Sequence, residues 1–138
     1  MANVREIDKN DDIFVGIEFP LDHSVQGFFR KTKTIRQQVK SNIRNLLLTE
    51  RGERLFQPNF GSNLKSLLFE QITSETLLNV ENDVRESITT WLPYVILNNV
   101  FVIQDERNPN LILTSIEYST NLEPNALDTI TFQFEVGE

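Results

Sequence analysis

Apolar positions follow helical spacing in the first part of this chain and strand spacing in the last. Residues 34–48 carry apolar side chains on one stripe and basic or polar side chains on the other, which predicts an amphipathic helix. Residues 1–33 lack such a stripe, and residues 13–21 mix apolar and acidic positions as a short extended segment does. We therefore expect an N-terminal arm at 1–33 and one domain at 34–138.

Two further helices are predicted before the region of strand spacing. The longer covers residues 73–91, where adjacent threonine and serine residues can cap the first turn and Pro93 follows as a stop. The shorter helix ends at Phe69 and begins at Ser62 or Asn63. Either side chain can accept a hydrogen bond from a free amide of the first helical turn.

Period-two alternation then predicts three strands. They cover residues 95–103, 111–120 and 127–136. In the last strand Ile130, Phe132 and Phe134 alternate with polar residues, so one face is apolar and the other faces water. Turns are predicted at residues 108–110 and 121–125, which contain asparagine and proline. The fold class is α+β, with N-terminal helices packed on one face of a small antiparallel C-terminal sheet.

Composition narrows the function classes. The chain has 138 residues, the size of one domain, and is 39% hydrophobic and 24% charged, as expected of a folded chain. Its 20 acidic residues exceed its 13 basic ones, so its net charge of -7 opposes binding to nucleic acid. The absence of cysteine excludes disulfides and thiol chemistry, and the start of the sequence predicts neither a signal peptide nor a membrane span.

Candidate catalytic groups are few. His23 is the single histidine and is expected to be a solvated turn residue in the arm, and no phosphate loop or paired-histidine metal motif occurs. We expect no cofactor and no metal.

Glutamates remain as candidates, because Glu50, Glu53 and Glu70 would suffice in number for glycoside hydrolysis. However, Arg51 and Arg54 are interspersed with the first two, and such charges lower rather than raise a carboxyl pKa. A salt-bridged surface loop is the favoured interpretation.

The segment after the first helix is a shaped loop. It holds two glycines and Pro58, which oppose helix, together with Phe56 and Phe60. The aromatic rings can plug the loop into the domain's own core, present a binding surface, or do both. Arg54 can pair internally with Glu70 or Asp83, or with a partner's carboxylate.

This segment resembles the baseplate wedge and sheath-initiator family of contractile-tailed phages, which also includes a baseplate component of the type VI secretion system. The residues that carry the resemblance are Thr49, Gly52, Arg54, Phe56, Pro58, Phe60, Gly61, Leu64, Leu67, Leu68, Phe69 and Glu70. The order of helices and strands extends the similarity over residues 34–136.

The resemblance implies a non-enzymatic structural protein of the virion tail baseplate, assembled in the host cytoplasm. It implies that the protein joins the wedge to the first ring of sheath subunits, with residues 127–136 offering a strand edge that templates sheath polymerisation. Implied partners are the tail sheath protein and other wedge proteins, with tail tube or hub proteins as further candidates. Nucleic acid and membrane are not among them.

One position departs from the family pattern. Many members carry a Glu-Pro-Arg triplet after the long helix, which grips a helical bundle of neighbouring wedge proteins, and here the triplet is Leu92, Pro93 and Tyr94. The turn is retained and both charges are lost, so a contact there would be apolar, with Trp91 and Tyr94 as anchors. Trp91 is alternatively the last core residue of its helix.

The predicted partner-binding residues are Arg54, Phe56, Phe60, Trp91, Pro93, Tyr94, Ile130, Phe132 and Phe134. Two alternatives stay open. The first is a muramidase-type peptidoglycan hydrolase, since family members have been labelled lysozyme-like. The second is the equivalent subunit of a type VI secretion baseplate.

Overall fold

The computed structural model describes residue 9 and residues 16–18, 31–32 and 34–135. The chain forms two compact units, Met1–Asn45 and Leu46–Glu138. In the first unit, β1 (Gly16–Ile17) pairs antiparallel with β2 (Lys31–Thr32). Residues 1–8, 10–15, 19–30 and 33 of the predicted arm, which include His23, lie outside the described residues.

The first predicted helix is confirmed as α2 (Ile35–Leu48), which begins in the first unit and ends in the second. Thr34 precedes it, and the Thr34 hydroxyl accepts a hydrogen bond from the Gln37 amide at 3.2 Å. The Gln37 side chain in turn accepts one from the Thr34 amide at 3.4 Å. This reciprocal capping box satisfies two amides that the helix cannot satisfy itself.

The second unit holds the other two helices, α3 (Leu64–Leu68) and α4 (Ser74–Trp91). Thr73 caps α4, because its hydroxyl accepts a hydrogen bond from the Thr76 amide at 3.2 Å. The predicted side-chain cap of α3 is wrong: Asn63 stands at the N-cap position, but its side chain makes no capping hydrogen bond. Its backbone and the Ser62 hydroxyl are used in other contacts instead.

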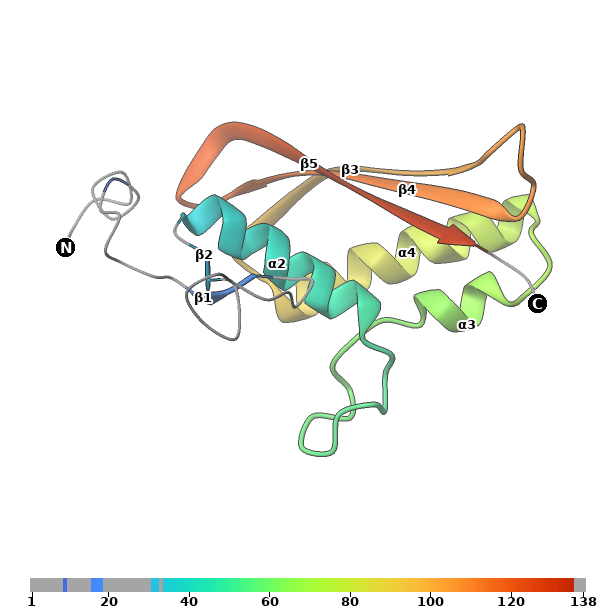
Figure 1. The fold of residues 1–138 in the computed structure, drawn as a ribbon, viewed down its shortest axis with the longest axis horizontal. Coiled ribbons are helices and arrows are strands. Elements are labelled where there is room, and N and C mark those ends of the chain that lie inside the picture. Colours follow the sequence, from blue (N-terminus) through green and yellow to red (C-terminus); the bar gives the residue numbers. More distant parts are fainter. Residues whose placement is uncertain (1–8, 10–15, 19–30, 33, 136–138) are drawn as a thin grey trace. The chain divides into compact units, whose positions relative to one another are not determined.

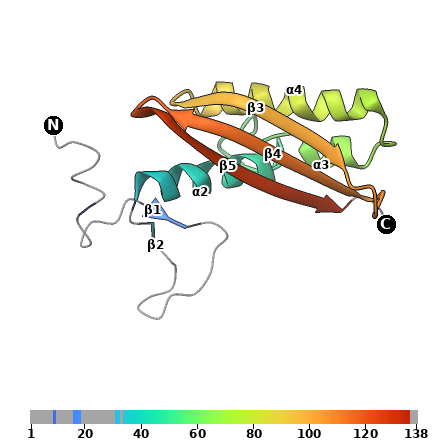
Figure 2. The same ribbon diagram turned by 90° about the horizontal axis from the view of Figure 1, so that it is seen from above.

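The predicted sheet is confirmed as three antiparallel strands in the order β3-β4-β5. They are β3 (Val95–Gln104), β4 (Leu111–Thr120) and β5 (Glu123–Glu135). Figure 1 shows α4 running along one face of the sheet, where it packs against β3, with α3 beside α4. Figure 2 shows β4 between the two outer strands. The α+β prediction therefore holds.

The core of the second unit comes from the apolar sides of these elements. Its most buried apolar side chains, each no more than 1% exposed, are Leu46, Leu47, Leu64, Val80, Val84, Ile88, Ile112 and Ile116. None of the described helices has the length and apolar content needed to cross a membrane.

The start of the last strand differs from the prediction. The turn expected at residues 121–125 is shorter, because Glu123 already pairs with Thr120. Residues 124–127 then lie opposite the single residue Ser119, so β5 has a bulge of several residues here. Proline has no amide to donate to a ladder, and the bulge lets Pro124 stand in an outer strand. Regular pairing resumes at Asp128.

Candidate functional site

The loop between α2 and α3, residues 49–63, is called the connector below. Figure 1 shows it projecting away from the sheet of its unit. Backbone hydrogen bonds close it twice: the Ser62 amide donates to the Thr49 carbonyl at 2.9 Å, and the Gly52 amide to the Pro58 carbonyl at 2.6 Å. The connector is therefore the fixed loop that its glycines and proline predict.

Two glycines of the connector have positive φ angles, 92° for Gly52 and 122° for Gly61. A Cβ atom on Gly61 would lie 2.4 Å from the Thr49 carbonyl oxygen, the acceptor of the outer closure. A Cβ atom on Gly52 would meet nothing within 4 Å. Gly61 is thus required both for its backbone conformation and for close approach of the two arms of the connector.

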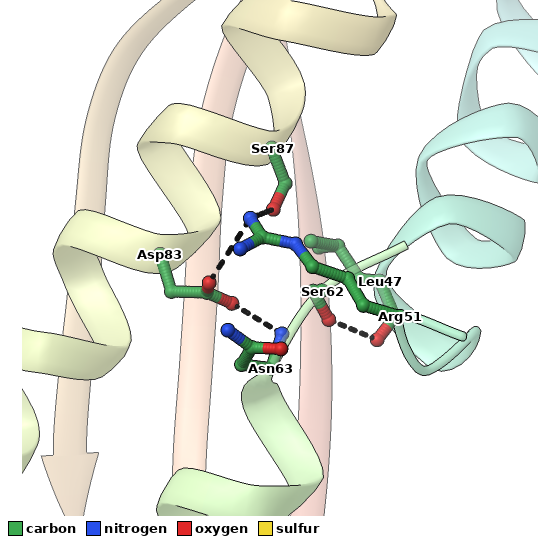
Figure 3. Close-up of polar contacts among 6 residues, drawn as sticks. All are labelled: Leu47, Arg51, Ser62, Asn63, Asp83 and Ser87. Atoms are coloured by element: carbon green, nitrogen blue, oxygen red, sulfur yellow. Dashed lines mark hydrogen bonds and ion pairs between the residues drawn. The ribbon is translucent and has the colours of Figure 1, made fainter. Parts of the chain in front are cut away.

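A buried carboxylate ties the connector to α4, as Figure 3 shows. Asp83 is 8% exposed. One of its oxygens accepts the Asn63 amide at 2.9 Å, and the other lies 3.4 Å from Nη2 of Arg51. The same Arg51 nitrogen is 3.4 Å from the Ser87 hydroxyl, one turn further along α4. The Ser62 hydroxyl donates to the Leu47 carbonyl at 2.8 Å, which joins the connector to the end of α2.

Burial raises the pKa of the Asp83 carboxyl above its ordinary value. The Asn63 hydrogen bond and the Arg51 guanidinium act in the opposite direction, and the Glu86 carboxylate adds to the rise. The two partners therefore compensate only part of the cost of removing this carboxylate from water.

Three of the predicted partner-binding residues form one stack. The Arg54 guanidinium carbon lies 4.0 Å from the centroid of the Phe60 ring. The Phe60 ring meets Trp91 edge to face, with centroids 5.2 Å apart and an interplanar angle of 69°. Phe60 and Trp91 are each partly buried, so this pair both fixes the connector against the end of α4 and leaves ring surface in contact with water.

Phe56 stands apart from this stack. It is 97% exposed, and its neighbour Leu55 is 93% exposed. The interpretation of Phe56 as a core plug is wrong, because its side chain is almost fully exposed to solvent. Leu55 was not among the residues predicted from sequence.

Pro93 and Tyr94 form the turn between α4 and β3. The Val95 amide donates to the Leu92 carbonyl at 3.0 Å, so Pro93 and Tyr94 are the two central residues of a β-turn. The Asn121 amide donates to the Tyr94 carbonyl at 3.0 Å, which fastens the turn to the β4–β5 hairpin. Pro93 is exposed and Tyr94 partly buried, so the predicted apolar contact surface is open here.

The three predicted residues of β5 differ in accessibility. Ile130 is 3% and Phe132 is 7% exposed, so their side chains belong to the core. Phe134 is partly exposed and stacks on Phe132, with ring centroids 6.0 Å apart. A partner could therefore contact Ile130 and Phe132 only through the strand backbone. It could contact Phe134 through both the backbone and the ring.

Of the glutamates that were considered as catalysts, Glu50 and Glu53 lie in the connector and Glu70 follows α3. Glu53 and Glu70 are exposed, and the Glu53 carboxylate accepts a hydrogen bond from the Glu50 amide at 3.0 Å. Among the residues that the structure describes, no group of three or more His, Cys, Asp and Glu side chains is arranged to hold a metal ion.

Sequence reasoning missed the contacts around Asp83. It considered Asp83 only as a partner for Arg54, and it treated Arg51 as a surface charge beside Glu50. The available signal was the position of Asp83 on the apolar stripe of α4, between Val80 and Val84. A charged residue at such a position requires a partner.

Known proteins are similar to this chain in sequence and in fold. The chain is 25% identical to baseplate wedge protein gp25 of Enterobacteria phage T4 over 99 residues, which cover 70% of this chain and 73% of the phage protein. A crystal structure of a proposed tail lysozyme from Geobacter sulfurreducens is 29% identical, with a TM-score of 0.70 over 78% of this chain and 96% of that one. A chain of the anti-feeding prophage baseplate has the same fold, at 24% identity and a TM-score of 0.59, covering 88% of this chain and 85% of that one.

The sequence profile described as "Baseplate wedge protein gp25" matches residues 33–125. This match spans helices α2, α3 and α4 and strands β3 and β4, and it reaches into β5. The chain belongs to the baseplate wedge protein gp25 family.

Proposed function

We propose that this protein is a structural subunit of a contractile-tail baseplate that joins the wedge to the first ring of the tail sheath. Family membership supports the baseplate role. The observation that carries the sheath role is the outer edge of β5, which pairs with β4 on one side and with no other described strand. Such an edge offers backbone donors and acceptors to an incoming strand.

The other outer strand, β3, is a poorer template. Its pairing with β4 is interrupted at Asn98 and its longest unbroken register runs only from Asn99 to Gln104, whereas β5, beyond its bulge at residues 124–127, keeps an unbroken register from Asp128 to Glu135. Bulges are a common device that prevents an edge from recruiting another strand. The proposed docking edge is therefore residues 128–135, with Phe134 continuing the apolar face toward the added strand.

The contact with neighbouring wedge proteins is assigned to the end of α4. Trp91 is the last residue of α4, and Pro93 and Tyr94 follow it in the turn to β3. Phe60 contacts Trp91, and Arg54 lies over the Phe60 ring, so both are close to the end of α4. The surface combines aromatic rings and a guanidinium, which are groups enriched at interface centres, with the exposed Pro93 beside them. We assign the assembly step to the host cytoplasm, and tube or hub proteins remain further candidate partners.

A proline at Thr131 tests the sheath role, because proline removes a backbone donor and disturbs the strand. The matched control is Phe101→Pro, since Phe101, Ser115 and Thr131 occupy one row across the sheet. Particles carrying Thr131→Pro should form baseplates without full sheaths, while the Phe101→Pro control should form sheaths of normal length. Circular dichroism of each purified variant establishes that it is folded. Normal sheaths with Thr131→Pro would contradict the proposal.

A peptidoglycan hydrolase is the second candidate, because the Geobacter sulfurreducens relative is a proposed tail lysozyme. The arrangement of acids favours the structural role, because Asp83, whose carboxyl pKa is raised by burial, is held by Arg51 and Asn63 and is not free to act on a substrate. A cell-wall hydrolysis assay on the wild type and on Glu50→Gln, Glu53→Gln and Glu70→Gln separates the two. Cleavage that depends on one of these carboxylates would establish the enzyme.

A further inference from the structure

The tip of the connector exposes two adjacent bulky apolar side chains, Leu55 and Phe56. At 93% and 97% they are the most exposed large apolar residues in the described part of the chain. Neither contributes to the core, so no requirement of folding explains them. An apolar pair at a projecting tip is typical of an interaction site.

The tip is held in a fixed conformation before any partner arrives. The Gly52–Pro58 closure at 2.6 Å brackets it, and the Glu53 amide donates to the Glu50 carbonyl at 3.1 Å. The salt bridge from Arg51 to Asp83 then fastens its base to α4. Binding through a fixed loop costs little conformational entropy, which favours insertion into a partner.

The size of the tip indicates what can cover it. An aromatic side chain buries about 150–250 Å², so Phe56 with Leu55 offers roughly half of the ~800 Å² that each partner buries in a stable two-body complex. The tip alone cannot hold a dimer together. It suits a hot spot within a larger interface, in which one projecting residue fills a partner's pocket.

Charge argues against two other occupants. The charged side chains of the connector balance one another: Glu50 and Glu53 are acidic, and Arg51 and Arg54 are basic. The whole chain carries a net charge of -7, which opposes both a second copy and an anionic lipid surface. The favoured occupant is a different protein with an apolar pocket in a neutral or basic surface.

We propose that Leu55 and Phe56 insert as an apolar knob into a pocket of a second, different baseplate protein. This inference rests on the proposed function, because it takes the baseplate as the setting. It adds a contact that is separate from the β5 edge and from the Pro93–Tyr94 turn.

Site-specific photo-crosslinking in assembled particles tests the identity of the partner. A benzophenone amino acid replaces Phe56, and the same group at Leu78 on α4, which is 60% exposed, is the control. We expect the Phe56 probe to crosslink in high yield to one baseplate protein that is not this chain. Crosslinks only to a second copy, or no crosslink in intact baseplates, would overturn the inference.

A double substitution tests the energetic role. Leu55→Ser with Phe56→Ser should leave the urea midpoint of the purified protein unchanged, because both side chains are exposed. It should lower incorporation into baseplates by about tenfold or more, as expected for a hot spot. Leu78→Ser should lower it little. Normal incorporation of the double variant would overturn the inference, as would tip-dependent sedimentation of the wild type with phosphatidylglycerol vesicles.

These outcomes are distinguishable from a failure of the proposed function. If the wild-type protein is absent from purified baseplates, the proposed function fails. If the wild type and the double variant are both incorporated equally well, only the knob is refuted.

Discussion

Gly61 is the residue on which closure of the connector most depends, and Gly61→Ala is the substitution that tests this. The φ angle of 122° lies far from the conformations open to alanine. Holding a non-glycine residue in such a region costs about 1–3 kcal/mol. In addition, the new Cβ would lie 2.4 Å from the Thr49 carbonyl oxygen, so the two arms of the connector must separate.

That separation weakens the 2.9 Å hydrogen bond from the Ser62 amide to Thr49. A hydrogen bond of this kind contributes about 0.5–1.5 kcal/mol. Alanine also lowers the conformational entropy of the unfolded chain, which stabilises the folded state by about 0.4–1 kcal/mol. The free energy of unfolding should therefore fall by about 0.5–4 kcal/mol.

Gly52→Ala is the matched control, because Gly52 has a positive φ of 92° and open space where its Cβ would be. It should lose only the backbone contribution of about 1–3 kcal/mol, less the same contribution of about 0.4–1 kcal/mol from the unfolded chain. Urea unfolding is followed by the fluorescence of Trp91, the single tryptophan, which contacts Phe60 of the connector. Equal losses for the two variants, or a smaller loss for Gly61→Ala, would refute the close-approach argument.

Three further experiments test other contacts of the protein by urea unfolding. For Asp83, whose pKa is raised in the folded state, the stabilising contribution is complete below the ordinary value of 3.8 and is lost as the pH rises through the folded value. The free energy of unfolding of the wild type minus that of Asp83→Asn should therefore be larger near ~pH 4 than near ~pH 7, and the opposite trend would show that pairing with Arg51 outweighs burial. A double-mutant cycle of Phe60→Leu and Trp91→Leu, followed by circular dichroism, should give a coupling of about 0.5–1.5 kcal/mol for the edge-to-face pair, and no coupling would contradict a direct contact. Thr114→Val should raise the free energy of unfolding by about 1 kcal/mol, because its buried Oγ1 has no hydrogen-bond partner within the described part of the chain, and a large loss would indicate a missing partner.

The elements that local sequence determines were predictable. The N-cap of helix α4, Thr73, and the proline that follows its last turn, Pro93, both lie next to the helix in sequence. The predicted bounds of β4, residues 111–120, are those that the structure has. The inward alternation of Ile130 and Phe132 was likewise visible, since it depends only on strand period.

The contacts that join distant segments were not predictable in the same way. Arg51 has acidic neighbours in sequence, and only the fold brings it to Asp83 on α4. The bulge at residues 124–127 follows from the pairing of β5 with β4, and Pro124 is its one local signal in the sequence. The exposure of Phe56 depends on the conformation of the connector, which an aromatic residue near a proline does not reveal.

The proposed sheath role predicts what should pair with the outer edge of β5 in an assembled particle. A cryo-electron microscopy map of the baseplate with its first sheath ring, resolved to the level of individual strands, tests it most directly. The account predicts a strand of a sheath subunit hydrogen-bonded along residues 128–135. A β5 edge that faces solvent, or one covered by a wedge protein, would contradict it.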